Sequence, residues 1–207
     1  MMRKMISITL TALLFIPLFI GTDTASAASR QGKIINPPSE LSKKESFKQH
    51  VLENLKDDYP NAQFLDKNFR EGERYQKQEM ILGGSDFTIA APAPPLTSLE
   101  VYAAISSNYP EYEYFSSNQL SSVQDHGGEE LYIVTAELGY GFQRNAAFNG
   151  SQLSEIDREN IDLEGDSIVD GWFIWWDASG NENGLFTYEN TSTNSPWNTM
   201  FDRMNIK

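Results

Sequence analysis

The second half of the sequence predicts an all-β fold, a sandwich or barrel of about seven short strands. In several runs of residues 91–207, apolar and polar side chains alternate with a period of two, as in strands with one buried face. Gly, Asn and Ser separate the runs, and the dipeptide Asn149-Gly150, which is preferred in tight hairpin turns, follows one of them.

Each expected strand rests on its own run of residues. The clearest runs are 99–105, 130–138, 142–148, 172–176, 185–188 and 200–206. The run 130–138 has apolar residues on both faces, as expected for a strand between two packed layers.

Residues 28–90 predict a charged, partly helical arm in front of the β-domain. A capping-box pattern begins at Ser42, and apolar side chains then recur every four residues from Phe47 onwards. Pro60 ends this pattern because proline cannot continue a helix. We therefore expect a helix over about 42–58, followed by short apolar islands that form no core of their own.

The charge of the chain changes at a proline-rich junction, residues 90–95. Residues 29–90 carry 10 basic and 10 acidic side chains, whereas residues 91–207 carry 4 basic and 18 acidic side chains, a net charge of −14. The prolines favour an extended linker or a processed junction. Residues 28–90 are therefore either a lasting arm or a pro-segment, and we expect processing near this junction. Residues 91–207 are expected to remain folded without this arm, because they contain all the expected strands.

Residues 1–27 predict a secretory signal peptide. A basic start at Arg3 and Lys4 precedes the apolar stretch 6–20, and Ala25-Ser26-Ala27 has the small residues of a cleavage site. The apolar stretch is short for a membrane span, although an uncleaved N-terminal anchor is the alternative. We therefore expect a secreted, extracellular protein with no stable membrane insertion after cleavage.

Composition excludes several classes of site and partner. The chain has no cysteine and two histidines, which excludes a thiol nucleophile, a cysteine zinc site, an iron–sulfur cluster and a histidine-rich metal site. The acidic half repels phosphates, so neither nucleic acid nor anionic lipid is an expected partner.

The segment 162–170 has the carboxylate spacing of a calcium loop. Counted from its first residue, acidic side chains occupy positions 1, 3, 5 and 9. Serine stands where such loops usually have glycine, and the bidentate glutamate of position 12 is replaced by Phe173. The alternative is an acidic, solvated turn. The candidate Ca²⁺ ligands are the side chains of Asp162, Glu164, Asp166 and Asp170 and the main-chain carbonyl of Ile168.

The run 172–177 concentrates aromatic side chains on one expected strand. Trp172 and Trp176 face the same side, together with Ile174, and Asp177 faces the other side. These three residues, the two tryptophans and Asp177, are candidates for a platform that stacks on sugar rings. Core packing is the commoner role for tryptophans in a sandwich and is the favoured alternative.

His126 follows Asp125 and precedes a glycine pair. A histidine oriented by a neighbouring carboxylate can act as a general base. No nucleophile elbow, phosphate loop or paired catalytic carboxylate motif accompanies it. A turn histidine bonded to nearby backbone is the favoured alternative.

Six strings of residues 91–207 resemble the YolA-like family of small secreted proteins from bacilli. The resemblance implies secretion and a bacterial source, and it supplies neither an activity nor catalytic residues. The strings are Ala93-Pro94-Pro95-Leu96-Thr97-Ser98, Asp125-His126-Gly127-Gly128, Glu137-Leu138-Gly139-Tyr140-Gly141, Asp170-Gly171-Trp172, Trp176-Asp177-Ala178-Ser179-Gly180 and, in the last segment, Asn190-Thr191-Ser192-Thr193-Asn194 with Pro196-Trp197-Asn198-Thr199-Met200.

Taken together, these patterns favour a secreted binding or surface-associated module over an enzyme. We expect calcium to stabilise it, and a carbohydrate or cell-wall polymer is the expected kind of ligand. The alternative is a secreted hydrolase that uses His126 as its general base.

Overall fold

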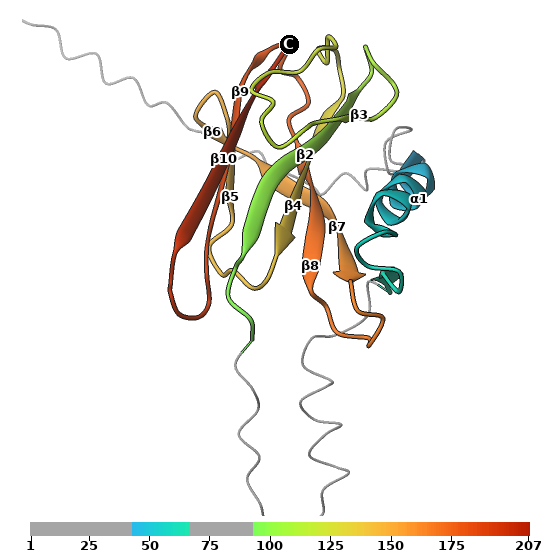
Figure 1. Ribbon diagram of the computed structural model, residues 1–207. Coiled ribbons are helices and arrows are strands. Elements are labelled where there is room, and N and C mark those ends of the chain that lie inside the picture. The colour runs from blue at the N-terminus through green and yellow to red at the C-terminus, as the bar shows by residue number, and fades with distance from the viewer. Residues whose placement is uncertain (1–42, 67–92) are drawn as a thin grey trace, which may run out of the picture. The chain divides into compact units, whose positions relative to one another are not determined.

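Two antiparallel β-sheets pack face to face in the computed structural model, which describes residues 43–66 and 93–207 (Figure 1). The larger sheet has the strand order β1-β7-β8-β4-β2-β3, and the smaller has the order β10-β9-β5-β6. Both sheets are open at their edges, so the structure confirms the all-β prediction as a sandwich rather than a closed barrel.

The described residues form ten strands and one helix. The elements are α1 (Lys44–Leu55), β1 (Gln63–Leu65), β2 (Ser98–Ser106), β3 (Glu113–Tyr114), β4 (Leu131–Leu138), β5 (Asn145–Phe148), β6 (Ser151–Gln152), β7 (Ser154–Asp162), β8 (Gly171–Asp177), β9 (Gly184–Thr191) and β10 (Thr199–Ile206). The six runs identified from the sequence correspond to β2, β4, β5, β8, β9 and β10. The predicted signal peptide, 1–27, lies outside the described residues.

The main core fills the space between the two sheets. Trp172, Ile174 and Trp176 of β8 face the smaller sheet, whose Phe186 and Tyr188 are fully buried against them. Alternate residues of β8 therefore point to opposite sides of the sheet, as the period of two predicts. With no cysteine in the chain, this packing rather than a disulfide holds the two layers together.

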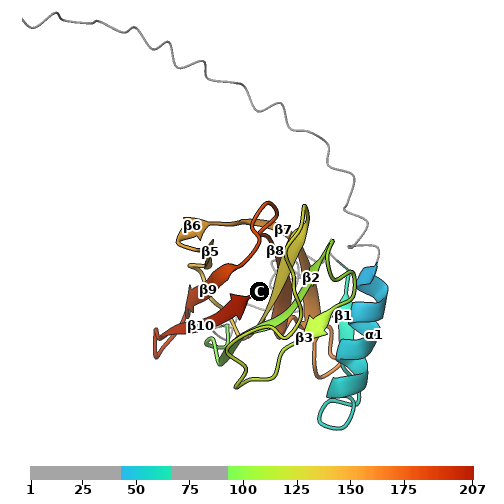
Figure 2. The ribbon, with the colours of Figure 1, turned by 90° about the horizontal axis from the view of Figure 1, so that it is seen from above.

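A second core covers the outer face of the larger sheet. Phe47 and Val51 of α1 are fully buried there, against Phe173 and Trp175 of β8. Figure 2 shows α1 beside β1 and β3, away from β9 and β10. The larger sheet is thus buried on both faces, which explains the two apolar faces of 130–138.

The expected arm contributes more to this fold than its sequence indicates. Besides the helix, residues 63–65 form β1, which pairs with β7 at the edge of the larger sheet. The arm therefore contains a strand that the sequence does not predict, and residues 43–66 belong with the β-domain in one compact unit, Asn36–Lys207. Removal of residues 28–90 stays a prediction. No helix within 43–66 or 93–207 is long and apolar enough to cross a membrane.

A buried carboxylate joins the two sheets. Glu137 of β4 is 1 % exposed and accepts hydrogen bonds from Nε of Arg144 (2.6 Å), the hydroxyl of Tyr188 (2.8 Å) and Nδ2 of Asn190 (2.7 Å). Tyr188 and Asn190 belong to β9 of the opposite sheet. The guanidinium of Arg144 also lies 4.9 Å from the ring centre of Trp172. Burial by itself lowers the pKa of Arg144, but the adjacent Glu137 raises it overall.

We predict that Glu137→Ala lowers the free energy of unfolding by about 3–5 kcal/mol, because it leaves Arg144 without its buried counter-ion. Urea unfolding followed by tryptophan fluorescence measures the change. The matched control is Glu155→Ala, which removes a similar pair with Arg158 at the surface and is expected to cost less than about 1 kcal/mol. Equal losses in the two variants would contradict a special role for the buried carboxylate.

Candidate functional site

Three aromatic side chains remain at the surface at one end of the smaller sheet. Phe142, Trp197 and Phe201 are 58 %, 62 % and 56 % exposed. We call these three residues the aromatic surface. A single exposed apolar residue needs no explanation, whereas three large exposed rings at one end of a sheet make that end the candidate binding surface.

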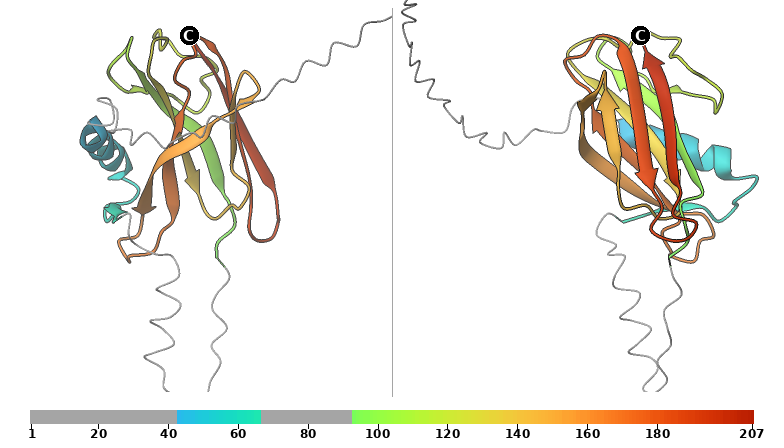
Figure 3. Two further views of the ribbon diagram at one scale, coloured as in Figure 1. Left: turned by 180° about the vertical axis from the view of Figure 1, so that it is seen from behind. Right: turned by 90° about the vertical axis from the view of Figure 1, so that its left-hand side faces the viewer.

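The register of the smaller sheet places these residues near one another. Thr199 at the start of β10 pairs with Thr191 at the end of β9, and Phe201 follows two residues later on the same face. The amide of Phe142 donates to the carbonyl of Thr191, which places this residue on the other side of β9 (2.9 Å). Trp197 belongs to the loop between β9 and β10. Figure 3, right, shows this loop at the lower end of the two strands.

Trp197 is held in a backbone conformation that L-residues rarely adopt. Its φ is +58°, which carries a steric cost of about 1–2 kcal/mol for a residue with a side chain. The loop is fixed by main-chain bonds from Trp197 to Asn194 (2.8 Å) and from Ser192 to Asn198 (2.9 Å). The side chain of Asn194 also donates to the carbonyl of Ala93, which ties the loop to the segment before β2. The loop therefore holds Trp197 in a costly backbone conformation while its indole is exposed, and backbone strain of this kind is common at ligand sites.

Phe142 is positioned by a close contact between a glycine and the buried Asn190. A side chain at Gly141 would overlap the Asn190 amide, so only glycine fits there. The side-chain oxygen of Asn190 accepts the main-chain amide of Gln143 (3.1 Å), and the main-chain carbonyl of Thr191 accepts that of Phe142. The backbone is therefore fixed at Phe142 itself and at the residues before and after it.

Polar side chains accompany the aromatic surface on the same sheet. The side-chain amide of Asn145 donates to the carboxylate of Glu189 (3.0 Å), and Glu189 pairs with Phe201 across the strands. The hydroxyls of Thr191 and Thr199 lie 2.9 Å apart. Aromatic rings with amide, carboxylate and hydroxyl groups beside them can stack on a sugar ring and bond its hydroxyls.

The tryptophans predicted as a ligand platform lie elsewhere. Trp172 and Trp176 are 5 % and 4 % exposed in the core between the sheets, which agrees with their alternative role in packing. The indole of Trp176 donates to Thr135 (2.9 Å). Asp177 is half-buried and accepts the amide of Ser179 (3.0 Å), so it caps a turn. Stacking on a sugar requires an exposed ring. The indoles of Trp172 and Trp176 are buried, whereas the rings of the aromatic surface are exposed.

His126 pairs with a carboxylate that the sequence does not single out. Its Nε2 lies 2.8 Å from Oε2 of Glu113, whereas the neighbouring Asp125 accepts the amide of Gly127. Glu113 also accepts the amides of Val123 (2.7 Å) and Gln124 (2.9 Å), so it fixes the loop that carries the histidine.

The environment of His126 favours the neutral imidazole. Burial lowers the pKa of His126 below 6.5, although Glu113 and Asp125 act in the opposite direction. Burial raises the pKa of Glu113, but its two amide donors and His126 together lower it. The imidazole is fully buried, and its Nδ1 has no hydrogen-bond partner among the described residues. A general base needs access to substrate, which this position does not provide, so the hydrolase interpretation stays an untested prediction.

The carboxylates of the acidic loop bond to the amides of the loop itself. Asp162 is fully buried and accepts the amides of Gly165 (2.7 Å), Asp166 (3.2 Å) and Ser167 (2.6 Å) and the side-chain amide of Gln63 (2.9 Å). The other acids do not join it around one point. Asp166 caps Ile168, Asp170 accepts the amide of Leu163, and Glu164 is exposed.

This arrangement does not fit a calcium ion without rearrangement. Within 43–66 and 93–207, no group of three or more His, Asp or Glu side chains is placed to hold a metal ion. Calcium binding by Asp162, Glu164, Asp166, Asp170 and the carbonyl of Ile168 therefore stays a prediction from spacing.

Sequence reasoning missed the aromatic surface and Glu113. The signal for Trp197 is its position between proline and asparagine in a segment rich in turn residues, where a tryptophan has no strand to hold it in a core. Glu113 lies 13 residues from His126 along the chain, and no local pattern connects the two.

We predict that His126→Ala lowers the free energy of unfolding by about 2–4 kcal/mol, because it opens a cavity and removes a bond to Glu113. The pKa of His126 is lower in the folded than in the unfolded protein, so its contribution is complete above pH 6.5 and is lost as the pH falls below that value. Urea midpoints at several pH values should therefore fall more steeply below pH 6.5 in the wild type than in the variant. An unchanged midpoint in His126→Ala would contradict the structural role.

We also predict that Asp162→Ala lowers the free energy of unfolding by about 2–4 kcal/mol, because it leaves buried amides without an acceptor. The control in the same loop is Glu164→Ala, which is expected to be nearly neutral because Glu164 is exposed. Melting curves with and without a chelator distinguish two origins of this loss, the hydrogen bonds to loop amides and the binding of calcium. A loss that is the same in chelator supports the amide bonds, whereas a loss confined to calcium-containing buffer would contradict them.

Comparison with known proteins identifies the family of the sandwich. A search of the curated proteins finds no match to this chain. The model of one family, described as Domain of unknown function (DUF4879), matches residues 91–206. The match includes every strand from β2 to β10 and therefore both sheets, whereas α1 and β1 precede it. The resemblance of this region to an uncharacterised family is thereby confirmed, and its YolA-like assignment stays a prediction. Since the match covers more than half of the chain, the protein belongs to the Domain of unknown function family DUF4879.

Proposed function

We propose that this protein is a secreted binding module that holds a carbohydrate or cell-wall polymer on the aromatic surface. The exposure of Trp197 in a left-handed backbone conformation carries this proposal. A buried or relaxed position would be less costly, so a function for the exposed indole explains why the loop keeps it. Phe142 and Phe201 supply further rings on the same end of the sheet.

The negative charge of the domain favours uncharged polymers over polyanionic ones as ligands. The net charge of −14 over residues 91–207 disfavours polyanionic wall polymers, because a long phosphate or carboxylate chain would be repelled along its length. Rings of uncharged sugars stack on aromatic side chains without that penalty. A polymer of neutral sugars is therefore the favoured ligand.

Two further parts of the proposal rest on the sequence. The signal-peptide pattern of residues 1–27 supports secretion, and finding Ala28 as the first residue of protein from culture medium would test it. The carboxylate spacing of 162–170 supports stabilisation by calcium. At roughly 1 mM calcium, a dissociation constant near 0.1 mM gives about 1.4 kcal/mol of stabilisation, which melting curves can detect.

We predict that Trp197→Gly weakens binding to insoluble neutral polysaccharides about ten-fold or more, because an aromatic anchor is lost. Glycine adopts the +58° φ without strain, so the melting temperature should stay within about 3 °C of the wild type. Pull-down with glucan, polymeric N-acetylglucosamine and isolated cell wall, alongside a polyphosphate control, measures the binding.

A matched variant separates this site from general stickiness. Leu120→Ala removes a side chain that is 66 % exposed in the segment between β3 and β4, and it should leave binding unchanged. The proposal fails if no neutral polymer is retained by the wild type, or if Leu120→Ala and Trp197→Gly lose binding equally. A fall of 10 °C or more in Trp197→Gly would return the indole to a structural role.

A further inference from the structure

The outer face of the larger sheet concentrates aromatic rings beneath α1. Phe47 contacts five of them, with ring centres 5.0–6.0 Å away. These contacts are edge-on or tilted, apart from one stacked pair, so Phe47 fills a socket between rings. The rings of this socket belong to Tyr102, Tyr112, Tyr114, Phe173 and Trp175.

Acidic side chains of β7 complete this face. Glu159 is 2 % exposed, and Lys48 lies 3.1 Å from it. Lys44 pairs with both Asp157 and Glu159 and lies 4.8 Å from the ring centre of Trp175. The face therefore takes two cations and one aromatic side chain from a single helix.

The sequence of α1 supplies that set at helical spacing. Lys44, Phe47, Lys48 and Val51 recur three or four residues apart, so they lie on one side of the helix. His50 adds a ring that stacks on Tyr114, with centres 3.6 Å apart. This is how a helix docks into a groove, with regularly spaced anchors.

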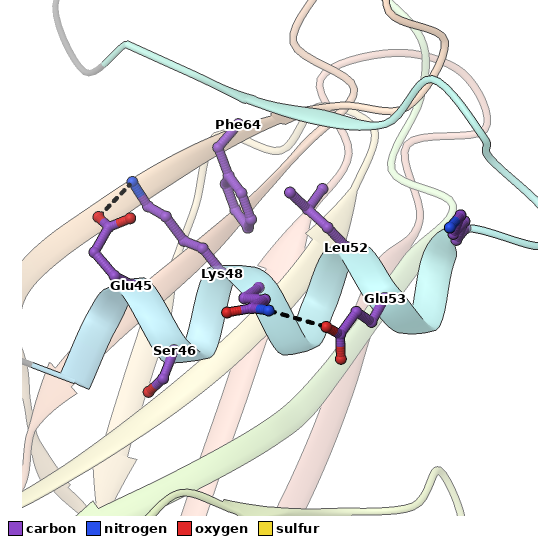
Figure 4. Close-up of a pocket in the computed structure, with 8 residues that line it drawn as sticks. Glu45, Ser46, Lys48, Leu52, Glu53 and Phe64 are labelled. Carbon is purple, nitrogen blue, oxygen red and sulfur yellow. Dashed lines mark hydrogen bonds and ion pairs between the residues drawn. The ribbon is translucent and has the colours of Figure 1, made fainter.

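A second groove lies between α1 and Phe64 of β1, and it differs from the socket because it is open and not filled by a ring. Figure 4 shows Phe64 of β1 and Leu52 of α1 pointing into it, with the pair formed by Lys48 and Glu45 at its rim. The larger sheet thus contacts α1 through the rings around Phe47, and β1 lies along another side of the helix, where Phe64 faces it.

From this geometry we propose that the outer face of the larger sheet is a binding site for a helix that presents an aromatic anchor and two lysines on one side, and that α1 is its intramolecular ligand. The matched family domain begins at residue 91, so it contains the socket without the helix that fills it. The electrostatic complementarity is local: Lys44 and Lys48 on the contact face of the helix meet the acids of β7. It follows that a cut between residues 66 and 93 leaves a two-chain complex rather than a free domain.

The test uses the full chain with a recognition sequence for a specific protease inserted within 67–92. After cleavage, gel filtration at low micromolar concentration and mass spectrometry should find both fragments in one peak. An excess of labelled peptide 43–66 should exchange into the cut protein. The substitution Phe47→Ala in this peptide should weaken its binding to the cut protein by about 100-fold. Gln49→Ala, at an exposed position on the same helix, should leave the binding unchanged.

Each outcome decides the proposal. Separation of the wild-type fragments after cleavage would overturn it and would favour a removable pro-segment. Equal binding of the wild-type and Phe47→Ala peptides would also overturn it, since pairing of β1 with β7 would then be sufficient. Because both substitutions are made in the peptide, a failure of the substituted full chain to fold does not affect the result. A Lys48→Glu peptide gives an independent check, with binding expected to fall about ten-fold as attraction to Glu159 becomes repulsion.

Discussion

The position of the smaller sheet depends on one buried carboxylate, Glu137. Apolar packing between sheets is strong but has little directional preference, whereas a carboxylate with three fixed donors sets a register. Arg144 balances its charge, and Tyr188 and Asn190 reach it from the opposite sheet. Such a network is costly unless every partner is present, so it selects one arrangement of the two layers.

The same network extends to the surface. Asn190 donates to Glu137 with its amide nitrogen and accepts the amide of Gln143 with its oxygen. Gly141 permits this approach, because any larger residue would overlap the asparagine. The turn that exposes Phe142 is therefore connected to the buried charge by one side chain. A binding surface built on this part of the sheet is held rigidly, which limits the entropy lost when a ligand binds.

Residue patterns predict six of the ten strands that the structure describes, and they do not predict the strands that are short or mostly polar. Six strands were predicted because apolar and polar residues alternate along them. β7 was missed because its residues Ser154–Asp162 are mostly charged or polar, and Lys44 and Lys48 of α1 pair with two of its acids. No local pattern reveals that a carboxylate is buried by a lysine more than 100 residues away.

The candidate site shows the same limit more clearly. The conspicuous tryptophans of β8 are core residues, and the acidic spacing of 162–170 serves loop amides in this structure. The tryptophans contact side chains of the opposite sheet, and the carboxylates accept amides of their own loop. Neither set of partners can be read from the local sequence. Trp197 is the opposite case, an isolated residue whose importance appears only from its exposure and its φ.

The two faces of the larger sheet explain why a chain without disulfides carries a helical segment outside its family domain. A sheet rich in aromatic residues on both sides needs two covers, and the smaller sheet supplies only one. The uncovered face would present Tyr102, Phe173 and Trp175 to water, an apolar patch that favours aggregation. Covering it with α1 removes that hazard and buries acids of β7 against lysines. Departure of the helix would therefore expose aromatic rings and leave the buried acids of β7 without their lysines, so the stability of the sandwich is coupled to residues 43–66.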